Sequence, residues 1–234
     1  SRLEIDEAWS FVAKKQRRLM PEDGSDKGDQ YIFLALADSA KAIISYRVGK
    51  RDGDNTRAFL ADMRERVLGA PEISSDAFPA YPDAVERAFG TDCRFGTIEK
   101  HYRAEPAVEA ARRYSPAVVV AVSKHRVVGH PRHISTSYIE RQNLTLRMQQ
   151  RRFTRLTNAF SKKLENHAAA VALYVGHYNF CRVHEALRVT PAMQVGVTDH
   201  IWTIGELVAA ALDSTIPTKP GRQVGRFRVI DGDR

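Results

Sequence analysis

The hydrophobic pattern of the first fifty residues predicts three consecutive β-strands. Four of the five odd positions over 3–11 are apolar, which is typical of a strand with one buried face. Residues 31–37 form a nearly unbroken apolar run, as expected for a central strand buried on both faces. A polar loop over 21–29 joins these strands, and a turn over 38–41 leads into a third strand over 42–48.

The next fifty residues alternate between helical and strand patterns. An apolar stripe predicts a helix over 54–67, for which Asp54, Asn55 and Thr56 offer N-cap side chains. A short strand ending at Asp76, a helix over 83–89 and a strand over 93–98 follow. The predicted order of elements up to this point is βββαβαβ.

The second half of the chain is predicted to be mainly helical. Prolines interrupt residues 100–135, in which only Val118–Val122 has a strand pattern, so this stretch is interpreted as an insertion. The remaining pattern predicts a long helix over 138–163, a second over 166–180, a C-terminal helix over 203–212 and a flexible basic tail over 217–234.

Composition is ordinary for a soluble globular protein. The 234 residues are 43% hydrophobic and 27% charged, and no apolar run approaches the roughly 20 residues that a membrane span needs. Two cysteines, Cys93 and Cys181, lie in no paired motif. We therefore expect no membrane association and a reducing, cytoplasmic environment.

The basic residues are unevenly distributed. The formal net charge is +8, and the stretch from Arg141 to Lys163 contains basic residues and no acidic ones. A polyanion such as DNA is the simplest partner for such a stretch, although a solvated helix face is an alternative. The predicted DNA-binding residues are Arg141, Asn143, Arg147, Arg151, Arg152, Arg155, Lys162 and Lys163.

Three acidic residues have settings that point to chemistry. Asp6 lies inside the first predicted strand, Asp76 ends the fourth, and Glu140 opens the long basic helix. The first and fourth strands of a βββαβαβ layout can be neighbours, which would bring these carboxylates together. Such a cluster needs a cation, and hard ions with oxygen ligands, Mg²⁺ or Mn²⁺, fit best. Two ions about 4 Å apart would suit phosphoryl transfer.

Each acid also has a structural interpretation. Asp76 could cap a helix, Glu140 could favour a helix N-terminus, and Asp6 could form a salt bridge. At about 100° per residue, however, Glu140 shares one sector of its helix with Asn143, Arg147 and Arg151. This arrangement predicts an exposed ridge with a metal at one end and DNA phosphates along its length.

At these positions the sequence resembles the transposases of small bacterial insertion sequences. Tyr138–Arg147 (YIERQNLTLR) resembles the helix of their third catalytic acid, and Tyr178–Leu187 (YNFCRVHEAL) the segment that ends many such catalytic domains. Ile5–Trp9 (IDEAW) and Ser75-Asp76 match the contexts of the first two acids. The resemblance spans about residues 3–195, and the stretch between Asp76 and Glu140 is longer than usual in the family.

The resemblance implies a ribonuclease H-like (retroviral-integrase-like) fold and a DDE mechanism. Asp6, Asp76 and Glu140 would bind two Mg²⁺ ions, which activate water to nick an element end and then the freed 3′-hydroxyl to attack target DNA. It also implies a catalytic domain over 1–195 with a helical extension over 196–216, at least a dimer in the working complex, and a place with the bacterial nucleoid.

Other functions stay open on the sequence. A domesticated transposase could bind DNA without catalysis, and a nuclease of the same fold, such as a ribonuclease H or a junction resolvase, would cleave without joining. A carboxylate-pair glycosidase explains two acids but not the arginines. His125, His130 and His133 are interpreted as a basic loop facing DNA rather than as a zinc site.

Overall fold

A six-stranded mixed β-sheet organises the chain. The computed structural model describes residues 1–102, 119–154 and 157–213. The strand order is β3-β2-β1-β4-β5-β6, in which β4 is parallel to both β1 and β5 and the other neighbours are antiparallel. The strands are β1 (Arg2–Val12), β2 (Gly28–Ala37), β3 (Ile43–Gly49), β4 (Glu72–Asp76), β5 (Arg94–Tyr102) and β6 (Val119–Val128).

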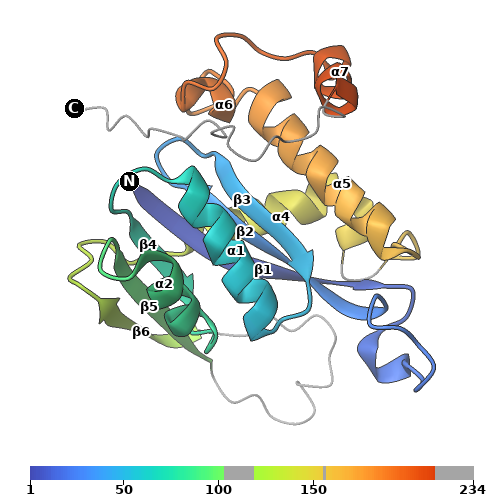
Figure 1. Ribbon diagram of the computed structural model, residues 1–234, viewed down its shortest axis with the longest axis horizontal. Helices are drawn as coiled ribbons and strands as arrows, with labels where there is room; N and C mark the ends of the chain where they lie inside the picture. Colours follow the sequence, from blue (N-terminus) through green and yellow to red (C-terminus); the bar gives the residue numbers. More distant parts are fainter. Residues whose placement is uncertain (103–118, 155–156, 214–234) are drawn as a thin grey trace.

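Helices cover both faces of this sheet (Figure 1). On one face, α1 (Gly53–Arg66) and α2 (Tyr81–Phe89) contribute to a core with β1, β2 and β4. On the other face, α4 (Ser137–Gln149) and α5 (Leu164–Gly176) form a second core with β1, β2 and β3. The protein is therefore a three-layer α/β structure.

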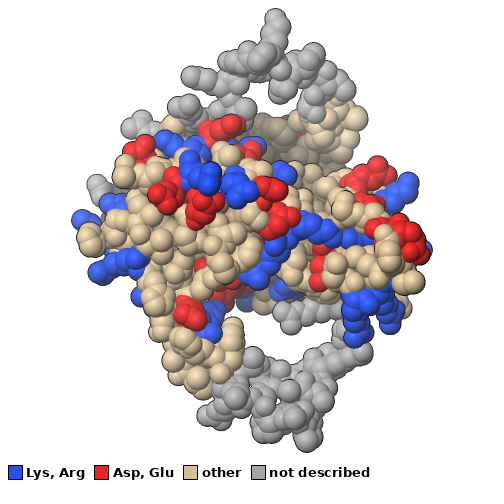
Figure 2. All heavy atoms as spheres, turned by 60° about the horizontal axis from the view of Figure 1, so that its bottom comes forward, with Lys and Arg blue, Asp and Glu red and all other residues tan. Residues whose placement is uncertain are grey.

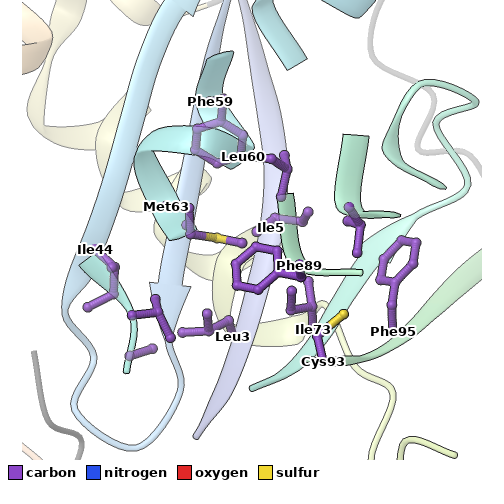
Figure 3. Packing of buried hydrophobic residues seen from close by; sticks show 14 of the residues in the cluster. Leu3, Ile5, Ile44, Phe59, Leu60, Met63, Ile73, Phe89, Cys93 and Phe95 are labelled. Carbon is purple, nitrogen blue, oxygen red and sulfur yellow. The ribbon is translucent and has the colours of Figure 1, made fainter. Parts of the chain in front are cut away.

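The central strands explain the apolar pattern of the sequence. Alternate residues of β2 enter different cores, since Phe33 packs with α1 whereas Ile32 and Leu34 pack with α4 and α5. Figure 3 shows the first of these cores, where Phe59 and Met63 of α1 lie over the sheet. Burial on both faces confirms that residues 31–37 belong to a central strand.

The predicted element order βββαβαβ is confirmed, and β1 and β4 are neighbours as expected. The predicted N-cap of the first helix was wrong by two residues. Asp52 caps α1, because its side chain accepts a hydrogen bond from the backbone N–H of Asn55 at 2.8 Å.

The prediction of one long helix over 138–163 was wrong. α4 ends at Gln149, and a 3₁₀ turn, η2 (Arg151–Phe153), follows it. Short hydroxylated side chains here bond to nearby backbone groups: Thr154 Oγ1 donates to the carbonyl of Arg151 at 2.6 Å, and Thr157 Oγ1 accepts from the N–H of Ala159 at 3.0 Å. Such bonds compete with helical ones, and Phe153 is drawn into the core between α4 and α5.

The region interpreted as an insertion belongs partly to the sheet. β5 extends to Tyr102, and β6 is an exposed edge strand rather than a short segment over 118–122. Residues 103–118 lie outside the described part of the chain, as does the tail predicted over 217–234. The insertion and the domain division at residue 195 stay predictions.

The C-terminal part is helical, as expected. α5 continues into a π turn, η3 (His177–Cys181), and is followed by α6 (Pro191–Gln194) and α7 (Ile204–Asp213). The side chain of Asn179 accepts from the N–H of Ile43 and donates to its carbonyl, which ties η3 to β3. Among residues 1–102, 119–154 and 157–213, no helix is long and apolar enough to cross a membrane.

Candidate active site

A cleft opens where β1 and β4 stop pairing. The parallel ladder ends at Glu4 opposite Ser74, and the same register, continued by two residues, brings Asp6 level with Asp76. Asp76 is the last residue of β4, so the cleft lies at the carboxyl end of a parallel strand, where α/β sheets commonly bind ligands. Its volume is about 650 Å³.

Three carboxylates meet in this cleft. Asp6, Glu7 and Asp76 each offer an oxygen such that all three atoms lie within 4.8 Å of one another. The predicted pairing of Asp6 with Asp76 is thus brought about by the fold. Glu7 was missed, although it directly follows Asp6, because consecutive residues of a strand normally point to opposite faces.

Glu7 is held from the side of α2. Its carboxylate accepts hydrogen bonds from the hydroxyl of Tyr81, at 2.6 Å, and from Nε of Arg51. The Arg51 guanidinium also lies 3.6 Å from Asp76 and 4.1 Å from the ring centre of Phe78. Arg51 therefore offsets part of the negative charge of two acids. It could not be found from a periodic pattern, because it lies between β3 and α1.

Asp6 is held from the side of α4. One carboxylate oxygen accepts from the backbone N–H of Glu7 and the other from Nδ2 of Asn143, both at 2.8 Å. Glu4, two residues earlier in β1, fixes α4 itself. Its buried carboxylate accepts from the backbone N–H groups of Tyr138 and Ile139 at 2.8 and 2.9 Å, which caps the helix and ties it to β1.

Glu140 lies in the same cleft, but it is not part of the group formed by Asp6, Glu7 and Asp76, which we call the close group. It lines the cleft from the first turn of α4, with its side chain 43% exposed. Its Oε1 accepts from Thr136 Oγ1 at 2.6 Å and contacts Nζ of Lys100 on β5. The fold brings all three predicted acids to one cleft, where Asp6 lies on β1, Asp76 on β4 and Glu140 on α4.

The close group has unusual proton affinity. Burial, followed by the charges of Glu7 and Asp76, raises the pKa of Asp6 to about 7. Burial and the charge of Asp76 raise the pKa of Glu7, and burial raises that of Asp76 against the opposing hydrogen bond from Phe78. A group of acids that retains a proton near neutral pH is one that a cation would stabilise.

The donor set fits a hard divalent cation. Carboxylate oxygens dominate the close group, and oxygen is the ligand that Mg²⁺ and Mn²⁺ prefer. Asn143 adds a further observation: its Oδ1 is buried and has no hydrogen-bond partner among the residues that the structure describes. Since buried polar atoms are normally satisfied, this oxygen is available to accept a hydrogen bond from water or to contact an ion.

The predicted DNA-binding residues do not form one ridge. Because α4 ends early, Arg147 lines the cleft while Arg151 lies in η2 and lines a different hollow. Asn143 is buried against Asp6 rather than exposed on a ridge, and its predicted contact with DNA stays a prediction. Arg152 donates to Ser161 Oγ and to the carbonyl of Asn166.

The other members of the basic stretch are dispersed. Arg141, Lys162 and Lys163 are exposed, and Lys163 lies 3.5 Å from Glu165. Arg155 lies outside the described residues. Where the structure describes the chain, the only group of three or more close metal-ligand side chains is Asp6, Glu7 and Asp76, so the histidines of the stretch 125–133 do not converge.

Comparison with known proteins links the chain to mobile DNA. No protein-family model matches it. The chain is similar to the insertion element iso-IS1n protein InsB of Shigella dysenteriae, with 23% identity over 177 residues, which cover 76% of this chain and 95% of that protein. The similarity therefore extends over nearly the whole length of a protein from an insertion element.

Proposed function

We propose that the protein is a DDE transposase that cleaves DNA ends and joins them to target DNA. The observation that carries the proposal is the convergence of Asp6, Glu7 and Asp76 within 4.8 Å at the end of β4, with Glu140 in the same cleft. The sheet order and the helices on both faces are compatible with a ribonuclease H-like fold. The similarity to an insertion-element protein agrees with DNA as the substrate.

Each residue has a role that its contacts support. Asp6 and Asp76 would hold Mg²⁺ or Mn²⁺, two ions per site, with Glu140 as a further ligand from α4. When bound, the ions supply Lewis-acid activation of the attacking oxygen and stabilisation of the leaving oxygen. Asn143 positions Asp6 by donating to its carboxylate. Arg147, on the same wall as Glu140, supplies positive charge where the phosphodiester would lie.

Glu7 and Lys100 refine this assignment. Glu7 is 2% exposed and fully engaged by Arg51 and Tyr81, so we assign it to holding the charge balance of the cleft rather than to binding DNA. Lys100 contacts Glu140, and a cation of higher charge would compete with it for that carboxylate. A working complex of at least two copies would follow, because two element ends have to be joined.

A strand-transfer assay tests the proposal. The protein is incubated with Mn²⁺ or Mg²⁺, a labelled duplex carrying the ends of its own element, and a plasmid target. We expect nicks at the element end and joined products, none of which form in EDTA. Cleavage without joining would support a nuclease of the same fold. DNA binding without cleavage under any metal condition would support a non-catalytic DNA-binding protein, and either result contradicts the transposase assignment.

A further inference from the structure

A second, strongly basic hollow lies at the far end of β1. The loop after this strand contains a 3₁₀ turn, η1 (Gln16–Arg18), and it faces the segment that follows α4. The hollow has a volume of about 860 Å³. We call it the distal groove and define it by its basic lining residues, Lys14, Lys15, Arg17, Arg18 and Arg151.

The distal groove carries uncompensated positive charge. None of the described residues that line it is acidic. Lys14 is paired with Asp23 at 2.7 Å, but Lys15, Arg17, Arg18 and Arg151 make no ion pair within 4.0 Å in the part of the chain that the structure describes. Arg57 and Arg87, by contrast, contact Asp54 and Asp83.

The walls of the groove are fixed by buried contacts. The backbone N–H of Ala13 donates to the carbonyl of Ser161 at 2.8 Å, and the rings of Phe11 and Phe160 lie with their centres 4.9 Å apart. The buried His167 bridges the hydroxyls of Ser10 and Ser161, each at 2.9 Å. Because these contacts join β1 to the segment 157–161, the backbone that carries the basic side chains is held in place before any DNA binds.

The carboxylate cleft and the distal groove lie along the same pair of elements. Along β1, Asp6 lines the cleft and Phe11 lines the groove. Along the second element, Glu140 lies in the first turn of α4 and Arg151 just beyond its end. Five residues of strand span about 16 Å at 3.3 Å per residue. A DNA duplex advances about 3.4 Å per base pair, so the same span corresponds to about five base pairs.

We propose that the distal groove binds backbone phosphates of the DNA duplex whose reacting phosphodiester lies at Asp6 and Asp76, about five base pairs away. Arg17 and Arg18, both exposed, would contact phosphates, with Arg151 closing the groove from the other side. Figure 2 shows a group of basic side chains at the lower right of the molecule, next to acidic side chains on the same end, and the loop with η1 lies at this end in Figure 1. This inference rests on the proposed function and adds a DNA-contacting surface to it.

The test combines DNA binding with steady-state cleavage. For R17Q/R18Q we expect about tenfold weaker binding to a 40-base-pair duplex at low salt. The slope of log K against log salt should become shallower by about 2, since each lost phosphate contact removes about 0.9. KM for DNA cleavage should rise by a similar factor, whereas kcat should stay within about twofold. R151Q, which changes the opposite wall, should show about half of the change in slope.

The matched control is R57Q/R87Q, which removes the same charge from exposed arginines of α1 and α2. It should leave the salt slope and KM unchanged. Wild-type binding and salt slope in both R17Q/R18Q and R151Q would contradict DNA binding by the distal groove. An equal loss of DNA binding in the control would also contradict it. The proposed function is tested separately, by metal-dependent cleavage with the wild-type protein at saturating DNA. That cleavage depends on Asp6 and not on the distal groove.

Discussion

Replacing Asp6 by asparagine is expected to reduce metal-dependent DNA cleavage by at least about a thousand-fold. Asparagine has nearly the same shape, and its amide oxygen can still accept the hydrogen bond from Asn143. What disappears is the negative charge that would hold a cation beside Asp76. A bound cation supplies several kcal/mol of transition-state stabilisation, and about 4 kcal/mol corresponds to a factor of about 10³ in rate.

Two further variants make this result specific. Glu140→Gln should show a comparable loss, because it retains the bond from Thr136 but removes the negative charge of the proposed ligand on α4. Asp83→Asn, a change of the same type on the exposed surface of α2, should cleave as the wild type does. Cleavage rates are compared in Mn²⁺ with matched DNA-binding isotherms. Wild-type activity in Asp6→Asn would refute the role of the cleft.

The second large effect concerns the pH dependence of the free energy of unfolding. We expect this dependence to differ between EDTA and Mg²⁺. The pKa of Asp6 in the folded protein is about 7, well above the usual value of an aspartate in an unfolded chain. The folded state therefore binds more protons than the unfolded state between about pH 4 and pH 7. It follows that the contribution of Asp6 to the free energy of unfolding decreases as pH rises through this range and is lost above pH 7.

His167 acts in the opposite direction, since burial lowers its pKa to about 4 and stability from this group rises up to about pH 6.5. Because His167 is present in both proteins, its contribution cancels when the stability of the wild type is compared with that of Asp6→Asn. In EDTA, we expect the wild type to lose about 2 kcal/mol relative to the variant between pH 5 and pH 8. For a chain of this size that is a relative fall in Tm of about 4–8 °C.

Mg²⁺ should abolish this loss for the wild type only. An ion at a hundred times its Kd stabilises the folded state by about 2.7 kcal/mol and holds the carboxylates deprotonated. Tm is measured by calorimetry at pH 5 and pH 8, with EDTA or Mg²⁺. An equal response to Mg²⁺ in wild type and Asp6→Asn would show that the ion stabilises the protein elsewhere.

Much of the fold could be predicted because local patterns agree with the tertiary structure. The apolar run over 31–37 has its pattern because β2 is buried on both faces, and the adjacency of β1 and β4 follows from the element order. The convergence of Asp6 and Asp76 depended only on these features. The helix over 138–163 failed because its apolar spacing continued past Gln149, while the helix-ending contacts of Thr154 and Thr157 are with nearby backbone groups.

The parts of the site that were missed depend on non-local contacts. Asn143 looked like a surface residue in the helical pattern, but the capping of α4 by Glu4 turns it towards Asp6. Arg51 lies outside any regular element, and its partner Glu7 is on β1, more than forty positions earlier in the sequence. The basic cluster Lys14–Arg18 is visible in the sequence, but Arg151 lies more than a hundred positions away, and only the fold places the two in one hollow.

The central claim is that the carboxylates at the end of β4 hold divalent cations against a phosphodiester. Anomalous diffraction from crystals soaked in Mn²⁺ tests it most directly. We expect manganese between the carboxylates of Asp6 and Asp76, with an oxygen of Glu140 drawn within about 2.5 Å once Lys100 is displaced. Crystals saturated with Mn²⁺ that show no anomalous peak at Asp6 and Asp76, or only peaks remote from this cleft, would contradict the account.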